Sequence, residues 1–518
     1  MTGAEILIRA LIAGRVEVCF TNPGTSEMHI VAALDRASEI RCVLGLFEGV
    51  VTGAADGYAR MAGKSACTLL HLGPGLANGL ANLHNASRAH VPIVNIVGQH
   101  ATHHLQYDTP LASDIEAIAR PYSKWLRTSQ SAADINRDAN DAMVAANTPP
   151  GQIATLIVPA DVAWNGVSAG ESDMRNSFSF PIAPMPGAEK IEKAGDMLRS
   201  GLRTAILLAD KGLYGKGLAA AGRIAAGTNA KLLAPYPFTR MERGAGLPTV
   251  ERMHYVLEQA VEQLKEFRQI ILVGATVPVS YFAYPDKDSV LTPPECLLYT
   301  LASPHEDCAG ALDALATALS LDERSSVPAQ AERVPVPTGE ITPQGLAAAV
   351  AALLPENAIV VDESMTSGRG LMAATRGCPR HDWLANTGGS IGIAMPLAVG
   401  AAVACPDRRV LCFSADGSGM YTAQALWTMA RENLNITTVI FANRSYAVLK
   451  REYSSLGVGE PGRRAADLFD IGRPDLDWVS LAKGMGVPGT RVTTLDTFVK
   501  ALQEGFQAEG PMLIEVRL

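Results

Sequence analysis

The chain has 518 residues, which is too many for one hydrophobic core, so several domains are expected. Hydrophobic residues make up 48% and charged residues 19% of the sequence, a balance typical of a buried globular protein and not of a disordered one. The net charge is −8 and the sequence has no long run of Lys or Arg, which argues against a nucleic-acid or anionic-membrane partner.

The first residues and the cysteines predict a cytoplasmic protein. Glu5 and Arg9 fall within the first helical pattern, which therefore differs from a signal peptide. The eight cysteines are scattered, with no CxxC pair, as is usual in a reducing compartment. The longest apolar stretch, 391–405, contains Pro396 and is too short to cross a bilayer, so it predicts a buried helix and no membrane partner.

Short β-rich runs alternate with helical patterns along the chain, which is typical of parallel sheets with crossover helices. Stretches rich in Gly, Pro and Ser at 165–186 and 325–339 separate three such units. The prediction is an α/β protein of three doubly wound parallel-sheet domains, spanning residues 1–165, 186–332 and 340–518. The predicted strands are 16–21, 42–47, 65–71, 93–98 and 153–158, then 204–208, 231–233 and 270–273, then 358–361, 410–413, 438–441 and 511–517.

Polar residues follow two of the predicted strands in the third unit. Asp416, in SADGS, and Asn443, in ANRSY, are 27 residues apart and would lie at the carboxyl ends of neighbouring parallel strands. A carboxylate and an amide oxygen are ligands that Mg²⁺ accepts, and Gly417 and Ser418 would allow a diphosphate to approach the backbone. Asp-Gly-Ser alone is also common in plain turns, so the matching Asn443 is what favours a ligand site.

These two motifs resemble the thiamine diphosphate (ThDP) motif GDG…N, with Ala415 in place of the first glycine. The resemblance implies that Asp416, Asn443 and the backbone carbonyl of Ser445 hold Mg²⁺. The residues that it implies for diphosphate binding are Gly417, Ser418, Tyr446 and, in a less closely matching turn, Thr366.

A second motif, LFEGVVTGAADGYARMAG, places Glu48 between an apolar strand and a helix of small residues. In ThDP decarboxylases a glutamate at this place protonates the N1′ atom of the aminopyrimidine ring, and the resemblance implies that role for Glu48. In NTGGSIGIAMP, Ile391 matches the wedge that bends the cofactor and Gly389 would accept a hydrogen bond from the 4′-amine, while Pro23 and Asn78 match positions near the pyrimidine. The alternative role for Glu48 is that of an acid in the first turn of a helix, where the helix dipole stabilises it. The alternative role for Ile391 is packing in the core.

The resemblance covers nearly the whole chain. The sequence is similar to both acetolactate synthase large subunits and benzoylformate decarboxylases. It implies ThDP- and Mg²⁺-dependent decarboxylation of a small 2-oxo acid, followed by protonation or carboligation of the enamine, as in acetolactate synthase. It also implies a homodimer or homotetramer with active sites at the subunit interface. A benzoylformate decarboxylase-like reaction is the alternative, and a non-catalytic partner or regulatory subunit is an alternative of another class.

The substrate side of the site matches the decarboxylase only in part. Thr25, in NPGTSE, matches the serine beside the substrate carboxylate, and His71, in LLHLGPG, matches a catalytic histidine, with a structural histidine as the alternative. The decarboxylase's second histidine falls on Phe282, and the synthase's active-site glutamine falls on Leu111. Residues 208–217 contain glycines but no convincing nucleotide loop, so FAD is not expected.

Three further motifs invite other interpretations. HATHH, residues 100–104, could suggest a zinc site but lacks a third ligand cluster. HLGPGLANG, residues 71–79, could suggest a dinucleotide loop, but no supporting acid follows about 20 residues on. Lys450 or Arg451, in VLKREY, could meet a substrate carboxylate or could end a solvated helix.

Overall fold

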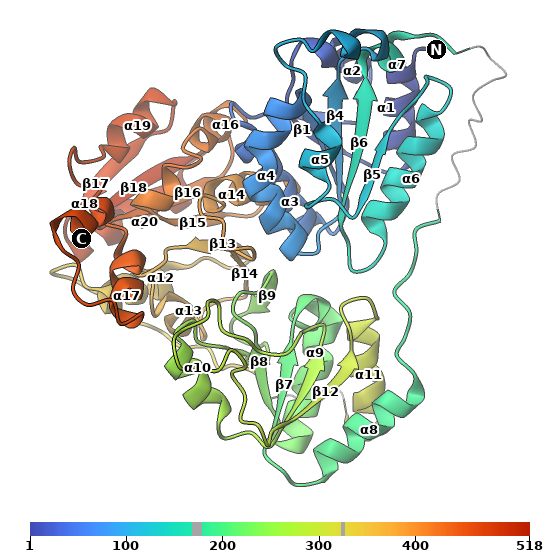
Figure 1. Cartoon of the computed structure of the whole chain (residues 1–518). Coiled ribbons are helices and arrows are strands. Elements are labelled where there is room, and N and C mark those ends of the chain that lie inside the picture. The colour runs from blue at the N-terminus through green and yellow to red at the C-terminus, as the bar shows by residue number, and fades with distance from the viewer. Residues whose placement is uncertain (168–178, 323–326) are drawn as a thin grey trace.

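A computed structural model of the chain describes residues 1–167, 179–322 and 327–518. They fold into three α/β units, each with one sheet and helices packed against it (Figure 1). The predicted α/β fold with three parallel-dominated sheets is thereby confirmed. Parts of the polar stretches predicted at 165–186 and 325–339 lie outside the described residues.

The first sheet has, within the described chain, six parallel strands in the order β2-β1-β3-β4-β6-β5. The chain passes from β1 outward to β2 and then continues with β3 on the other side of β1, so the strand order reverses between β1 and β3. Such a reversal opens a crevice at the carboxyl ends of the strands. The strands are β1 Val18–Asn22, β2 Arg41–Leu44, β3 Ala66–Leu70, β4 Ile93–Gln99, β5 Trp125–Thr128 and β6 Ile153–Pro159; the helices are α1 Gly3–Ala13, α2 Met28–Asp35, α3 Glu48–Ala62, α4 Leu72–Arg88, α5 Ile115–Ala119, α6 Ile135–Asn147 and α7 Ala160–Trp164, with the 3-10 turns η1 Thr25–Glu27 and η2 Thr102–Tyr107.

The second sheet has five strands in the described chain, all paired in parallel, in the order β10-β8-β7-β11-β12. Its central strands β7 and β11 are wholly buried, as expected when helices cover both faces of a parallel sheet. The strands are β7 Thr204–Leu208, β8 Lys231–Ala234, β10 Glu251–Arg252, β11 Gln269–Val273 and β12 Leu297–Ala302; the helices are α8 Ala188–Arg199, α9 Gly215–Thr228, α10 Leu257–Leu264 and α11 Cys308–Ala318, with the turn η3 Asp210–Gly212.

The third sheet follows the order β17-β18-β16-β15-β13-β14-β9 and is parallel except for its last pair. The strand β9, Arg240–Arg243, precedes the third unit in sequence by about a hundred residues, yet it pairs antiparallel with β14. The strands are β13 Ala358–Glu363, β14 His381–Ala385, β15 Val410–Ala415, β16 Ile436–Ala442, β17 Gly489–Val492 and β18 Met512–Arg517; the helices are α12 Pro343–Leu353, α13 Leu371–Ala374, α14 Ala394–Ala404, α15 Asp416–Gly419, α16 Ala425–Arg431, α17 Ala447–Ser455, α18 Arg463–Phe469, α19 Trp478–Gly484 and α20 Leu495–Gln507.

The first and third units share one hydrophobic core. Helix α3 of the first unit and helix α14 of the third contribute to the same buried cluster, in which Ala54 and Leu397 are at most 1% exposed. The apolar stretch predicted as a buried helix is α14, whose residues 394–403 are all buried. In the part of the chain that the structure describes, no helix combines the length and the apolar character needed to cross a membrane.

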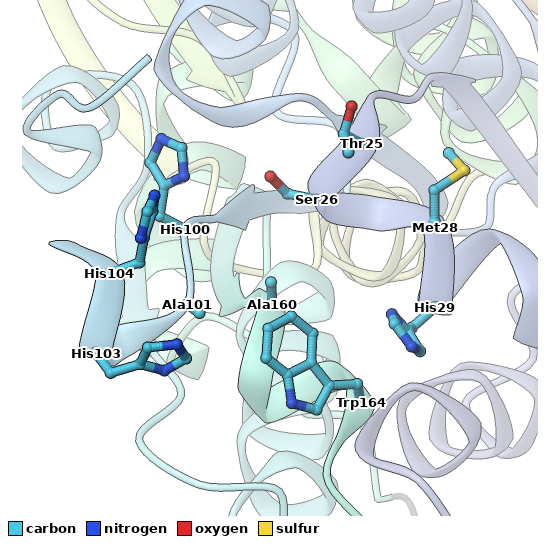
Figure 2. Close-up of a pocket in the computed structure, with 10 residues that line it drawn as sticks. All are labelled: Thr25, Ser26, Met28, His29, His100, Ala101, His103, His104, Ala160 and Trp164. Atoms are coloured by element: carbon cyan, nitrogen blue, oxygen red, sulfur yellow. The ribbon is translucent and has the colours of Figure 1, made fainter. Parts of the chain in front are cut away.

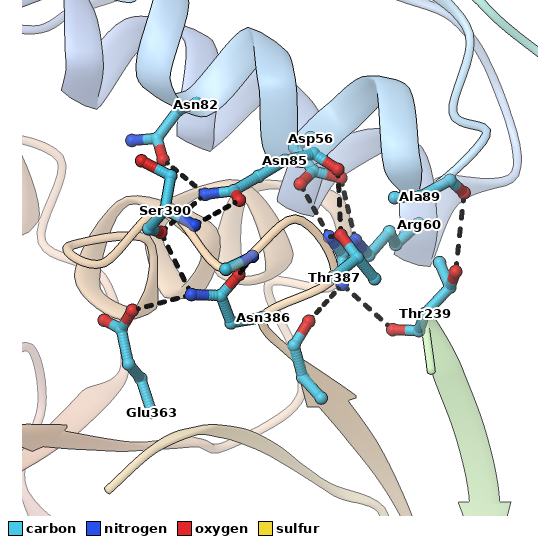
Figure 3. A network of polar contacts seen from close by, with 12 residues as sticks. Asp56, Arg60, Asn82, Asn85, Ala89, Thr239, Glu363, Asn386, Thr387 and Ser390 are labelled. Carbon is cyan, nitrogen blue, oxygen red and sulfur yellow. Dashed lines mark hydrogen bonds and ion pairs between the residues drawn. The ribbon is translucent and has the colours of Figure 1, made fainter. Parts of the chain in front are cut away.

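A buried arginine joins the three units (Figure 3). Arg60, near the end of α3, donates two hydrogen bonds of 2.7 Å to the carboxylate of Asp56, and neither side chain is exposed at all. The same guanidinium donates to the carbonyl of Thr239 in the second unit at 3.0 Å, and to the carbonyl of Ala385 in the third unit at 2.7 Å. One charge of the first unit therefore holds backbone from each of the other two units.

The turn at 386–392 is held from two sides. From the first unit, Asn85 on α4 donates to the carbonyl of Ser390 at 2.8 Å and accepts from its N–H at 3.1 Å. From the third unit, the buried carboxyl of Glu363 accepts from Asn386 Nδ2 at 3.1 Å and from the N–H of Gly392 at 3.0 Å. Burial raises the pKa of Glu363 to about 7, against the opposing effect of these donors.

We expect Arg60→Met to lower the free energy of unfolding by about 3–5 kcal/mol, because it leaves the Asp56 carboxylate buried without its partner. Urea denaturation measures the effect. The matched control is Arg36→Met, which breaks an exposed pair with Glu5 and should cost less than about 1 kcal/mol. Equal midpoints for the two variants would contradict the structural role of Arg60.

We expect the free energy of unfolding to fall as the pH rises from about 4.5 to 7. The folded chain keeps the Glu363 proton up to pH about 7, whereas the unfolded chain loses it near the ordinary value of 4.5. The unfolded state thus binds fewer protons than the folded state in this pH window. The resulting decrease in the free energy of unfolding amounts to about 3 kcal/mol at most.

Glu363→Gln should remove that part of the pH dependence, which a series of urea titrations between pH 4.5 and 8 measures. Glu356→Gln, at an exposed acid before the same strand, is the matched control and should keep the wild-type dependence. Parallel curves for wild type and Glu363→Gln would show that this carboxyl does not titrate between pH 4.5 and 7.

Candidate functional site

The predicted metal ligands lie together at the carboxyl edge of the third sheet. Strands β15 and β16 are neighbours, and Asp416 and Asn443 follow directly after them. The Asp416 carboxylate accepts a hydrogen bond of 2.6 Å from the N–H of Arg444, and Asn443 Oδ1 accepts one of 3.0 Å from the N–H of Ser445. The sequence thus brings these residues to one point, as adjacent parallel strands require.

The charge balance of this cluster fits a cation. Asp416 is only 2% exposed, and burial raises the pKa of its carboxyl group against the N–H donors of Arg444 and Gly417. No Lys or Arg side chain of the described residues lies within ion-pair distance of it, and the acidic Asp475 raises its pKa further. A buried carboxylate without a positive partner is costly, and a bound divalent ion would supply the missing charge.

The predicted diphosphate contacts surround the same point. The Tyr446 ring packs so closely on Gly417 that a Cβ there would lie 2.5 Å from it. Ser418 is buried in α15, directly after Asp416 and Gly417. Thr366 lies in the turn after β13, beside Ser367, whose hydroxyl oxygen is 3.5 Å from Asn443 Nδ2.

The turn that carries Gly389 and Ile391 faces an aromatic residue of the second unit. Gly389 has φ of +78°, and a Cβ there would lie 2.6 Å from the hydroxyl of Tyr281. Tyr281 forms no hydrogen bond through this hydroxyl within the described residues. Burial raises its pKa, so the phenol stays protonated as a donor. Phe282, which takes the place of the decarboxylase's second histidine in the sequence comparison, is 55% exposed and packs beside Tyr281.

The sequence analysis did not identify Tyr281. It belongs to a group of rings in which Tyr255 and Phe282 each lie 5.5 Å from its centroid and Tyr236 lies 6.3 Å away. The density of aromatic residues in SYFAYP was the available signal. Only the fold reveals which of these rings reaches the glycine-rich turn.

Glu48 lies at the carboxyl edge of the first sheet, as predicted, at the first position of α3. The residue is 7% exposed, and its carboxylate accepts from Asn22 Nδ2 at 3.2 Å and from Asn78 Nδ2 at 3.0 Å. Pro23 follows Asn22 directly at the end of β1. The structure therefore groups Glu48, Asn78 and Pro23, and it adds Asn22, which the sequence analysis missed.

His71 lies beside a buried acid that the sequence analysis also missed. Glu27 Oε2 is 2.8 Å from His71 Nδ1 and accepts a hydrogen bond of 2.8 Å from the N–H of Gly24. The Glu27 side chain is wholly buried, which raises its pKa against the opposing effect of His71. Gly98 leaves room for it, since a Cβ there would lie 1.7 Å from Glu27 Oε1.

This acid fixes the orientation of the imidazole ring. With Nδ1 bound to Glu27, the Nε2 atom of His71 has no hydrogen-bond partner within the described ranges and remains able to meet a ligand. Thr25 lies two residues before Glu27 on the same turn and is exposed. A carboxylate and an imidazole thus meet at the reversal of strand order between β1 and β3, with the hydroxyl of Thr25 on the adjoining turn.

In one chain the predicted residues form two separate clusters. The first sheet carries Thr25, Glu48 and His71, and the third carries the Asp416–Asn443 pair. No hydrogen bond or ion pair between described residues joins the acids and imidazole of the first cluster to the two ligands of the second.

The remaining predicted positions differ in their exposure. Leu111 is 40% exposed, and Lys450 is exposed on α17. Arg451 is half-buried, and its Nη1 atom lacks a hydrogen-bond partner. The HATHH segment forms part of η2, and in the described part of the chain no three His, Cys, Asp or Glu side chains are grouped to hold a metal ion.

Two family descriptions match the chain where these clusters lie. Residues 1–118 match the N-terminal TPP binding domain of thiamine pyrophosphate enzymes, and residues 368–516 match their C-terminal TPP binding domain. The Glu48 and His71 cluster falls in the first matched range, and the Asp416 cluster falls in the second.

Curated and solved relatives agree with this match. A Mycobacterium tuberculosis protein, provisionally named an acetolactate synthase large subunit, is 51% identical over 100% of this chain and 99% of that protein. The benzoylformate decarboxylase of Pseudomonas aeruginosa is 28% identical over 96% of this chain and 95% of its own length. The ThDP-dependent 4-hydroxybenzoylformate decarboxylase structure from Rhodococcus jostii RHA1 superposes with a TM-score of 0.88 at 25% identity, covering 100% and 99% of the two chains. The chain therefore belongs to the thiamine pyrophosphate enzyme family, and it is related to acetolactate synthases and benzoylformate decarboxylases.

Proposed function

We propose that the protein uses ThDP and Mg²⁺ to decarboxylate a 2-oxo acid, and that the product is then protonated or joined to a second carbonyl compound, as in acetolactate synthase. The observation that carries this proposal is the pair of buried Asp416 and half-buried Asn443 at adjacent strand ends, where no Lys or Arg side chain of the described residues pairs with the acid. An Mg²⁺ ion with a bound diphosphate accounts for that arrangement.

The residues of the third unit would hold the charged end of the cofactor. Asp416, Asn443 and the carbonyl of Ser445 would bind Mg²⁺, while Gly417, Ser418, Tyr446 and Thr366 would contact the diphosphate. When bound, ThDP supplies a carbon nucleophile and an electron sink for the departure of CO₂. Gly389 and Ile391, in the turn fixed by Asn85 and Glu363, would position the pyrimidine end.

The first unit would supply the proton chemistry. Glu48, held by the amides of Asn22 and Asn78, would hold a proton at the pyrimidine nitrogen. Thr25 would contact the substrate carboxylate. His71, oriented by Glu27 through Nδ1, would deliver or remove a proton at Nε2.

We further propose a homo-oligomer, a dimer or a tetramer, in which the first unit of one protomer faces the third unit of its partner. The support is that no hydrogen bond or ion pair between described residues joins the Glu48 cluster to the Asp416 cluster within one chain. On this proposal residues 1–165 bind the pyrimidine, 186–332 form a central domain without FAD, and 340–518 bind the diphosphate. The eight free cysteines support a cytoplasmic location, because the reducing cytoplasm keeps thiols unpaired.

One observation favours the second candidate function, a benzoylformate decarboxylase-like release of aldehyde. The His71–Glu27 pair provides an oriented proton donor close to Thr25, and aldehyde release requires a proton at the carbon that carboligation would instead bond to a second carbonyl. The non-catalytic alternative has less support, since a purely structural relative has no use for the buried and hydrogen-bonded Glu48.

Glu48→Gln should lower CO₂ release from 2-oxo acids by about 100-fold or more, because the general acid at the pyrimidine is lost. CO₂ is measured over a panel of 2-oxo acids with added ThDP and Mg²⁺, and calorimetry checks that the variant still binds the cofactor. Glu39→Gln, at an exposed acid of the same unit, is the control. If the wild type shows no CO₂ release and no carboligation, the result would favour the non-catalytic alternative.

Glu27→Gln should lower kcat by about 100-fold while the affinity for ThDP stays the same, because the charge that orients His71 is removed and the shape is kept. A double-mutant cycle with His71→Ala tests the coupling. If Glu27 acts through His71, the double variant is no slower than His71→Ala alone. Additive losses would show that Glu27 only supports the fold.

A further inference from the structure

The two candidate clusters differ in what surrounds them. Beside the Thr25 turn lies a cavity of about 330 Å³, and its lining residues all belong to the first unit (Figure 2). The segment that carries the Asp416 cluster's other ligands continues instead into helices α17 and α18, whose residues are all described and of which none is buried. Little apolar surface therefore holds α17, the helix that begins directly after Tyr446.

A loop of the second unit, residues 278–291 between β11 and β12, extends to the third unit. Its two ends are joined by hydrogen bonds between backbone groups. The N–H of Ser280 donates to the carbonyl of Ser289 at 2.8 Å, and the N–H of Leu291 donates to the carbonyl of Pro278 at 3.1 Å. The loop is therefore closed at its base.

Two tyrosines of this loop approach the third unit. The hydroxyl of Tyr281 faces Gly389. Tyr284 donates a hydrogen bond of 2.7 Å to Glu452 Oε2 on α17, and the hydroxyl of Tyr255, a residue of the same unit, lies 3.5 Å from Glu452 Oε1. Each oxygen of the Glu452 carboxylate thus has a tyrosine of the second unit as its partner.

The contact joins a charged acceptor to donors that keep their protons. Burial and the hydrogen bond to Glu452 raise the pKa of Tyr284 to about 12, and burial and the same carboxylate raise the pKa of Tyr255. Lys287 lies 5.8 Å from the centroid of the Tyr284 ring and pairs with Glu258 on α10. Tyr284 is therefore held by its own unit and bonded to α17, and a hydrogen bond to a charged group is among the stronger ones.

We propose that Glu452 and Tyr284 are positioning residues, which fix α17 and through it the proposed Mg²⁺ and diphosphate contacts. The inference rests on the proposed function, in which the carbonyl of Ser445 binds Mg²⁺ and Tyr446 contacts the diphosphate. Ser445 and Tyr446 both donate to the carbonyl of Phe469 at the end of α18, so the two exposed helices move as one. The bond from Tyr284 ties this pair of helices to the second unit.

Trypsin measures how often α17 opens, because Lys450 and Arg451 lie on it. In the full chain without ThDP, Tyr284→Phe should raise the rate of cleavage after these residues about 10-fold, because one hydrogen bond to a charged acceptor is lost and the ring is kept. Mass spectrometry identifies the fragments. The matched control is Tyr299→Phe, which removes another tyrosine hydrogen bond of the second unit, to the carbonyl of Lys190, and should leave this rate unchanged.

The rate of ThDP release tests the link to the cofactor. ThDP and Mg²⁺ are bound to the full chain, a chelator is added, and free ThDP is measured over time. Tyr284→Phe and Glu452→Leu should each release ThDP about 10-fold faster than the wild type. Glu452→Gln keeps an oxygen for Tyr284 and should lie between Glu452→Leu and the wild type. Glu460→Gln, at an exposed acid after α17, is the control.

A double-mutant cycle shows whether the two residues act through one bond. In the Glu452→Leu chain, Tyr284→Phe should change neither the cleavage nor the release. Unchanged cleavage in the single variants, or additive effects in the double variant, would overturn the proposal.

Two further outcomes separate this proposal from the proposed function. Faster cleavage with an unchanged rate of ThDP release would show that α17 moves without affecting the cofactor, and it would overturn the positioning role alone. If calorimetry detects no binding of ThDP by the wild type, the proposed function fails and the positioning role with it, whatever the cleavage rates are.

Discussion

The arrangement of the three units depends on the buried guanidinium of Arg60. A charge without solvent is tolerated only when every donor finds an acceptor, and here the acceptors are Asp56 and carbonyl groups from both other units. Any displacement of one unit would break a charge-assisted hydrogen bond in a place that water does not reach. The pair therefore fixes the relative position of the units more strictly than apolar packing alone, which tolerates small shifts.

That constraint reaches the candidate site through the turn at 386–392. Arg60 also donates to the hydroxyl of Thr387 at 3.0 Å (Figure 3). Asn85 accepts from the N–H of Ser390, and Glu363 accepts from the N–H of Gly392 at the other end of the turn. Tyr281 of the second unit completes the surroundings at Gly389. All three units thus determine the position of a few residues, so a change distant in sequence can alter the geometry offered to a ligand.

The sequence predicted the local features of this fold well. Continuous apolar runs such as 410–413 specify buried parallel strands, and polar residues directly after them specify the Asp416–Asn443 edge, because both depend on neighbours in the chain. The features that were missed depend on contacts between distant segments. Strand β9 has only four residues and no clear pattern, and its partner β14 lies about 140 residues further on.

The same reason explains the missed site residues. Glu27 gains its role from a ring 44 positions away, and Tyr281 from a glycine more than a hundred positions away. Within SYFAYP, the sequence alone could not decide whether residue 281 or 282 faces the turn. A wholly buried glutamate is rare enough that its burial would have indicated a partner, but burial at that position was itself not evident from NPGTSE.

Among the described residues, no lysine or arginine is a hydrogen-bond partner of Glu48 or His71, and this bears on the reaction proposed for the first cluster. A substrate carboxylate bound by a cation would be stabilised more before the reaction than in the transition state, where its negative charge is being lost, and that difference would oppose the loss of CO₂. The Thr25 hydroxyl and the His71 imidazole would orient the carboxylate without a lysine or arginine. On the proposed function, the two clusters are therefore complementary. The buried Asp416 on the third sheet would help to hold the cofactor through Mg²⁺, and the Thr25 and His71 cluster on the first sheet would bind the substrate carboxylate without a lysine or arginine that opposes its loss as CO₂.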